Sequence, residues 1–180
     1  IVEGSSIKII KTFFDKKFPY SDNYDAIIHS HLIEHIYDPR EIVESIYNKI
    51  PLGCLHIFSL PNLHYMFDNY YTNSLNFEHT LFMSEPYVEA LLNNYGFVIE
   101  EKHYFNNHSI FYAARKTSDN LINVKWPSLY QKNKMLFLKF IDYYTKTVEE
   151  LNYKTNSHKG EVYIFGAHIF SQFLLAFGLE

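Results

Sequence analysis

Short apolar runs, separated by polar turns, recur along the chain. Several of these runs lack a strict alternation of apolar and polar residues, which is typical of strands buried on both faces in the middle of a parallel sheet. Their short length and their content of Ile, Val and Phe favour strands over helices. The predicted strands lie at 7–14, 24–30, 54–60, 97–104, 109–114 and 161–165.

Apolar residues at helical spacing predict helices between and after these strands. Asp38 and Pro39 mark the start of the first helix, because Asp is a good N-cap and Pro is tolerated at the first helical position. Ser84 marks the start of the second helix in the same way. The predicted helices lie at 39–50, 84–95, 129–152 and 169–177. This alternation favours an α/β layered fold with a mostly parallel sheet, in which 97–104 and 109–114 form an antiparallel hairpin.

The composition of the chain limits which partners and which cellular compartment we expect. The formal net charge of the chain is −4, so we expect no broad basic face and no nucleic-acid partner. A single cysteine, Cys54, excludes an internal disulfide framework and fits a reducing, cytoplasmic location. No apolar run reaches the ~18 residues needed to cross a bilayer, and no signal peptide is visible, so we expect no membrane partner.

Candidate chemistry gathers where the predicted strands end. In open α/β sheets, ligands bind beyond the carboxyl ends of the strands. That rule points to Phe14 and Asp15, to Ser30 and His31, and to the residues that end at Asn62. The long connection at 63–83 is rich in aromatic residues, and a connection of this length is usually functional.

His31, Glu34 and His35 match the H-x-x-E-H pattern of some zinc hydrolases. Zinc would need both imidazoles on one face of a sustained helix, together with a third ligand. The helix here could last only about one turn before Asp38 and Pro39, because the residue before a proline disfavours helical geometry. A zinc hydrolase is therefore a minor alternative, polar residues in a plain loop are another, and we expect no metal site.

The stretch as a whole resembles class I S-adenosylmethionine-dependent methyltransferases. The sequence YDAIIHSHLIEHIYDP at 24–39 is similar to the family's fourth-strand region, which shows "yD.I", "lEHi" and then "DP". PLGCLHIFSLPN at 51–62 is similar to the fifth strand, "pgG.l.i..PN". FEHTLFMS at 77–84 is similar to "eHt.y.s", and LLNNYGF at 91–97 to the "ll...GF" that precedes the sixth strand. The four matches occur in the family's order.

The resemblance implies a Rossmann-like sheet, the cofactor S-adenosylmethionine and a small-molecule methyl acceptor. It places Glu3, Phe14, Asp15, Ser30 and His31 on the cofactor side. It offers His79 and His108 as general bases, with Glu78 assisting, because imidazole titrates near neutral pH. Asn62, Tyr65 and Tyr71 are the candidate acceptor-binding residues.

Two weaker resemblances concern the ends of the chain. VYIFGA at 162–167 is similar to the start of the small α/β domain that follows the catalytic domain of sugar C-methyltransferases, so a nucleotide-linked sugar is a candidate acceptor. NHS at 107–109 keeps the His and Ser of their His-Gly-Gly-Ser element without its glycines. We expect a partial catalytic domain at 1–117, a linker and long helix at 118–158, and the start of a second α/β unit at 159–180.

A rival interpretation follows from the family's glycine-rich cofactor turn, which has no counterpart in these residues. Glu3 is also followed within a few residues by the strand predicted at 7–14, whereas a parallel crossover needs about a dozen. Either the domain is truncated, or the protein is a non-catalytic remnant or partner subunit that keeps the fold. The methylated atom and the oligomeric state stay open.

Overall fold

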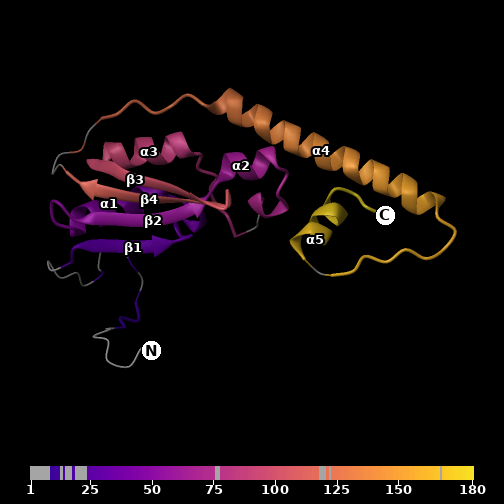
Figure 1. Cartoon of the computed structure of the whole chain (residues 1–180), viewed down its shortest axis with the longest axis horizontal. Coiled ribbons are helices and arrows are strands. Elements are labelled where there is room, and N and C mark those ends of the chain that lie inside the picture. The colour runs from indigo at the N-terminus through magenta and orange to yellow at the C-terminus, as the bar shows by residue number, and fades with distance from the viewer. Residues whose placement is uncertain are drawn as a thin grey trace.

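The computed structural model describes residues 9–12, 14, 18, 24–75, 78–117, 121, 123–166 and 168–180. These residues contain a four-stranded sheet with flanking helices (Figure 1). β1 and β2 are parallel, whereas β4 is antiparallel to both of its neighbours. The mixed α/β class and the antiparallel hairpin are therefore confirmed, in a sheet that is partly parallel. The strands are β1 (Ala26–Ser30), β2 (Leu55–Pro61), β3 (Phe97–Phe105) and β4 (Ser109–Lys116), in the spatial order β1-β2-β4-β3.

The main core lies between the sheet and two helices, α1 (Pro39–Lys49) and α3 (Glu85–Asn94). Val43 of α1 and Leu92 of α3 are fully buried in it. Helix α1 begins where its sequence predicts, because Asp38 accepts a hydrogen bond from the Arg40 N–H at 3.0 Å and Pro39 is the first helical residue. Ser84 occupies the N-cap position of α3, but its hydroxyl makes no capping hydrogen bond.

The opposite face of β1 is open. Ile28 is 73% exposed there, and Phe111 of β4 is 40% exposed. This differs from the expected burial of the apolar strands on both faces. The reason is that α1 and α3 pack against the other face of the sheet, and no described helix covers the face that carries Ile28 and Phe111.

The connection at 63–83 contains two short helical segments that the sequence pattern did not indicate. They are α2 (Leu63–Asp68) and the 3₁₀ turn η2 (Thr72–Ser74). Each is too short to show a helical period. Asn62 precedes α2 and caps it, since its side-chain oxygen accepts a hydrogen bond from the Tyr65 N–H at 3.4 Å.

A second, smaller core holds the C-terminal helices beside α2 (Figure 1). Helix α4 (Tyr130–Ser157) buries one stripe, made by Phe140, Tyr144 and Val148 at the predicted spacing of four residues. Helix α5 (Ile169–Ala176) adds Leu174 to the same cluster. None of the helices in the described ranges is both long and apolar enough to cross a bilayer.

Two of the predicted strands are not observed among the described residues. The strand expected at 161–165 is wrong, because these residues pair with no other strand and are exposed along their length. An apolar run forms a strand only when a neighbouring strand supplies hydrogen-bond partners, and none lies beside this one among the described residues. The strand expected at 7–14 is absent from residues 9–12 and 14, while 7, 8 and 13 lie outside the described residues.

Candidate active site

The carboxyl ends of the parallel strands β1 and β2 bring several polar residues together. Ser30 ends β1, and its hydroxyl lies 2.7 Å from the hydroxyl of Ser59 on β2. His31 follows with a left-handed backbone, φ 48°, and its N–H donates to the Ser59 carbonyl at 3.0 Å. This backbone region is uncommon for residues other than glycine. The hydrogen bond therefore holds a sharp turn that keeps the His31 imidazole at the end of the sheet.

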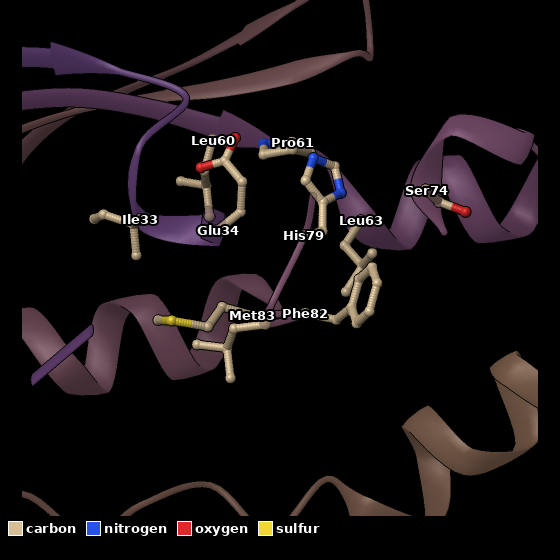
Figure 2. A pocket seen from close by; sticks show the side chains of 10 residues that line it. Ile33, Glu34, Leu60, Pro61, Leu63, Ser74, His79, Phe82 and Met83 are labelled. Carbon is tan, nitrogen blue, oxygen red and sulfur yellow. The ribbon is translucent and has the colours of Figure 1, made fainter. Parts of the chain in front are cut away.

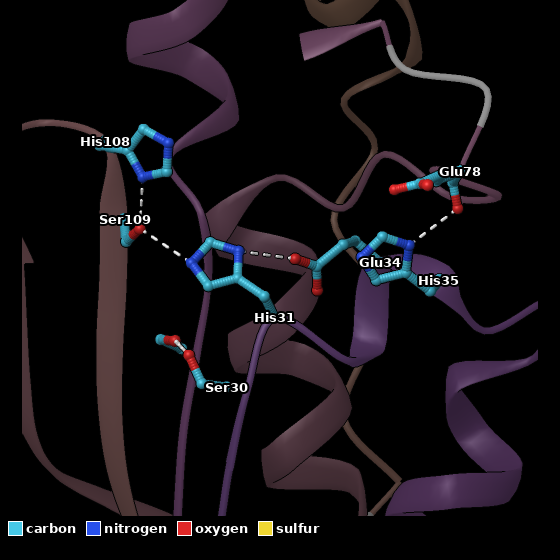
Figure 3. A network of polar contacts seen from close by, with 8 residues as sticks. Ser30, His31, Glu34, His35, Glu78, His108 and Ser109 are labelled. Carbon is cyan, nitrogen blue, oxygen red and sulfur yellow. Dashed lines mark hydrogen bonds and ion pairs between the residues drawn. The ribbon is translucent and has the colours of Figure 1, made fainter. Parts of the chain in front are cut away.

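A chain of side-chain hydrogen bonds runs along this end of the sheet (Figure 3). The His31 Nδ1 lies 2.9 Å from Oε1 of Glu34, and its Nε2 lies 3.1 Å from the Ser109 hydroxyl. The same hydroxyl lies 2.7 Å from Nδ1 of His108. Glu34 and Ser109 are buried, whereas His108 is exposed. We call Glu34, His31, Ser109 and His108 the polar relay.

The hydrogen-bonding capacities of these groups determine which atom of the relay carries each proton. An ionised carboxylate only accepts, so His31 donates its Nδ1–H to Glu34 and keeps a lone pair on Nε2. The Ser109 O–H then donates to that Nε2, and the Ser109 oxygen accepts from Nδ1–H of His108. His108 is left with a basic Nε2, which makes it the group of the relay that is able to take a proton from a ligand.

The order of carboxylate, imidazole and hydroxyl in the relay is also that of a hydrolase triad. Ser109 would be the nucleophile, but it is 3% exposed and its hydroxyl is shared by two imidazoles. A nucleophile must reach its substrate, so Ser109 is better described as the hub that orients His31 and His108.

An apolar pocket lies beside the relay, below the end of β2 (Figure 2). Glu34 and His79 are its titratable residues, and Phe82 and Met83 close one side. Its volume is about 20 Å³, which is room for about one water molecule and not for a methyl acceptor. The full lining is Ile33, Glu34, Leu60, Pro61, Leu63, Ser74, His79, Leu81, Phe82 and Met83.

The structure brings His31, Asn62 and His79 to one region, with Glu34 as the link. Glu34 bonds to His31 and lines the pocket with His79. Asn62 directly follows Pro61, another lining residue, and its N–H donates to the His108 carbonyl at 2.8 Å. The Asn62 side chain itself serves as the cap of α2.

The other predicted acceptor residues lie outside the pocket lining. Tyr65 and Tyr71 pack edge to face against each other, with their ring centroids 5.9 Å apart. Elsewhere in the connection, Phe67 is buried against Phe140, and Tyr70 stacks on Tyr143 at 3.8 Å. Phe82 is the aromatic residue of the connection that does line the pocket.

The predicted cofactor side is described in part. Ser30 and His31 lie at the end of β1, whereas Glu3 and Asp15 lie outside the described residues. Phe14 packs against the main core and borders an apolar hollow beside β1. The hollow is lined by Phe14, Ile27, Ile28, His29, Leu32, Ile42 and Ile46.

The two histidines of the H-x-x-E-H pattern do not face one point, as zinc ligands would. Only the 3₁₀ turn η1 (Ile33–His35) forms there. His31 is a hydrogen-bond donor to Glu34, while His35 turns the other way and contacts the Glu78 carbonyl at 2.8 Å. Glu78 is exposed, and His79 lies beside His35 with ring centroids 5.1 Å apart.

Ser109 matches the Ser of the His-Gly-Gly-Ser element, but it is not among the predicted site residues. It is the first residue of β4 and pairs in register with Pro61 at the end of β2. That register places its hydroxyl over the same end of the sheet as His31. The available signal was its position next to His108 at the start of a predicted strand.

Comparisons with known proteins give partial likenesses of the fold. No family model matches the chain, and no match to a curated protein was found. An O-methyltransferase family protein from Burkholderia thailandensis is similar with a TM-score of 0.40 at 10% identity, over 53% of this chain and 31% of that one. A structure from work on the conversion of a disulfide bond into a thioacetal group during echinomycin biosynthesis is similar with a TM-score of 0.41 at 12% identity, over 70% of this chain and 58% of that one. The chain thus spans less than two thirds of either structure, and these values do not establish a family.

Proposed function

We propose that this chain is part of a class I S-adenosylmethionine-dependent methyltransferase that acts on a small molecule. Nucleotide-linked sugars are the acceptors to be tried first. The observation that carries the proposal is the polar relay beside an apolar pocket, at the carboxyl ends of a parallel strand pair. Three of the four sequence segments that resemble the family, 24–39, 51–62 and 77–84, contribute residues to this place, and ligands of open α/β sheets bind there. The fourth, 91–97, lies at the other end of the sheet, where Phe97 pairs with Lys116.

The described residues fit the apolar part of such a cofactor. The hollow beside β1 has an apolar wall that includes Phe14 and Leu32. Ser30 and His31 would hold the cofactor at the end of β1, with Glu3 and Asp15 assigned to the same side. When bound, S-adenosylmethionine supplies an electrophilic methyl group on a sulfonium.

The chain's own residues would position the acceptor and remove its proton. The acceptor would lie at the exposed end of the relay, beside His108, and holding two reactants together can supply several kcal/mol. The cofactor would supply the methyl group, and the acceptor atom that receives it would lose a proton. The acceptor proton then passes to Nε2 of His108, while Glu34 and His31 stabilise the charged imidazole through Ser109. His79 is the second candidate base, and Glu78 would assist it.

Calorimetric titration with S-adenosylmethionine tests the proposal on the product of the complete reading frame. We expect saturable binding of one cofactor per chain. Ser30→Leu, which replaces a small hydroxyl at the cofactor side by a branched apolar group, should weaken binding at least about 10-fold, since each lost 1.4 kcal/mol is tenfold. The matched control is Ser128→Leu, at an exposed position before α4, which should bind like the unchanged protein.

Absence of binding heat with the unchanged protein would overturn the enzyme interpretation. The chain would then be the non-catalytic remnant or partner subunit that keeps the fold. Equal loss of binding in both variants would remove the assignment of Ser30 to the cofactor side.

A further inference from the structure

Three potential metal ligands converge at the edge of the pocket. The ligand atoms of Glu34, His35 and His79 all lie within 4.8 Å of one another. Glu34 and His35 come from the turn η1, and His79 comes from the connection that follows α2. The group shares two residues with the H-x-x-E-H pattern, but His79 takes the place of His31.

Backbone hydrogen bonds fix the two segments against each other. The N–H groups of Thr80 and Leu81 both donate to the backbone carbonyl of Glu34, at 3.0 and 3.3 Å. His79, directly before Thr80, is therefore held beside η1. The three ligands are positioned by the fold, so an ion would meet them with little rearrangement.

Each ligand on η1 is oriented by a hydrogen bond on its far side. His35 donates its Nδ1–H to the Glu78 carbonyl at 2.8 Å, which leaves the lone pair on Nε2 available. Glu34 accepts from His31 through Oε1 (Figure 3). Histidine metal ligands almost always donate the other ring N–H to a carbonyl or carboxylate, and ligating carboxylates are themselves hydrogen-bonded.

The second oxygen of Glu34 is the independent sign of a missing ligand. Glu34 is 5% exposed, and its Oε2 is buried without a hydrogen-bond partner among the described residues. A buried charge is expensive unless it is paired or coordinates a metal. The side chain lies at the wall of the pocket that it shares with His79 (Figure 2).

We propose that Glu34, His35 and His79 bind a divalent first-row transition-metal ion, with zinc as the probe. Two imidazoles and one carboxylate form a set that suits zinc or iron(II), whereas magnesium and calcium prefer oxygen ligands alone. Three protein ligands leave an open position for a water, for which the adjoining pocket has room. His31 is a positioning residue, because it holds the Glu34 carboxylate through Oε1.

This inference stands independently of methyl transfer. It also gives the two candidate bases different roles, since an imidazole whose lone pair binds the ion cannot take a proton from a ligand. His79 would then hold the ion, and His108 would remain as the base.

Metal binding can be measured on the untagged protein after treatment with a chelator. We expect one equivalent of zinc by elemental analysis, and visible absorption from one equivalent of Co²⁺ that zinc displaces. Glu34→Gln and His79→Asn should each weaken binding at least about 100-fold, and His31→Gln should weaken it about 10-fold or more, through loss of the orienting hydrogen bond. The matched control is His103→Asn, which removes an exposed histidine of β3 and should bind like the unchanged protein.

Thermal unfolding with and without zinc distinguishes a loss of metal binding from a folding defect. Zinc should raise the melting temperature of the unchanged protein and of His103→Asn, and leave Glu34→Gln and His79→Asn unmoved. Zinc affinity that is equal in His79→Asn and His103→Asn would overturn the proposal, and so would an unchanged protein that takes up no zinc. Zinc binding without S-adenosylmethionine binding would support this site while removing the methyltransferase.

Discussion

At the scale of single residues, a half-buried and a fully buried histidine lie next to each other at the edge of the core. Nε2 of His29 on β1 lies 2.9 Å from Nε2 of His56 on β2. Phe58 packs against both rings, with centroids at 5.3 and 4.6 Å. Burial lowers the pKa of His29 to about 4 from an ordinary 6.5, and burial lowers the pKa of His56 well below its ordinary value. The pair is therefore neutral in the folded protein at neutral pH.

This pair should make the protein sensitive to acid. Between pH 6.5 and pH 4 the unfolded chain binds a proton at His29 that the folded chain does not, so the free energy of unfolding falls as the pH drops through this window. Above pH 6.5 the contribution vanishes. Urea unfolding at the two pH values should show that His29→Gln removes about 2 kcal/mol of the decrease, allowing for the partial exposure of His29.

His158→Gln is the control for that comparison, because His158 is exposed and should keep the full acid sensitivity. An acid sensitivity that is the same in His29→Gln and in His158→Gln would contradict the prediction. The carboxyl groups are the same in all three proteins, so their effect cancels in the comparison.

The sequence predicts the residue types of the site better than their partners. Ser30, His31 and Asn62 could be placed because each lies at the end of a strand, or just after it, and an apolar run predicts that strand. The bond from His31 to Ser109 depends on the register of β2 against β4, which sets residues far apart in the sequence opposite each other. Local patterns carry no such register, so the relay could be found only from the structure.

At the scale of elements, helix α1 is closed at its C-terminal end by a residue from β4. Lys116 is 7% exposed, and its Nζ donates to the carbonyls of Tyr47 and Ile50, at 3.0 and 3.1 Å. The last carbonyls of a helix have no partner within it, and cations are favoured at that end. The ammonium also lies 4.4 Å from the centre of the Tyr47 ring.

Lys116→Met should destabilise the protein by about 2 kcal/mol, because the apolar side chain fills similar space but leaves two buried carbonyls without their charged donor. Chemical denaturation would measure the change. The control is Lys132→Met on the exposed surface of α4, which should alter stability little. Equal stability of the two variants would show that Lys116 does not hold the end of α1.

Elements were predictable where the signal is local. Asp38 and Pro39 start α1 because capping and a fixed proline φ act on neighbouring residues. The run at 161–165 has the composition of a strand, but a strand exists only through its neighbours, and this one has none among the described residues. Helix α2 escaped prediction because a helix of one to two turns shows no period.

At the scale of the whole molecule, the described chain has two separate hydrophobic clusters. The larger lies between the sheet, α1 and α3, and the smaller joins α2 to α4 and α5. Phe140 is fully buried at the centre of the smaller cluster, with ring centroids 5.0 Å from Phe67 and 5.7 Å from Phe173. The predicted division of the chain at 117 remains a prediction, but the two clusters suggest how to test it.

Phe140→Ala should loosen the smaller cluster alone. A buried Phe→Ala change costs about 3–5 kcal/mol, and here the cost falls on α2, α4 and α5, because the larger cluster does not contain Phe140. Hydrogen exchange should therefore show faster exchange in these helices and unchanged protection in β2 and β4. Leu138→Ala, at a position of α4 that is 47% exposed, is the control. Equal loss of protection in the sheet would instead mean that both clusters unfold as one unit, and the sheet with its site would then depend on α4 and α5 for its stability.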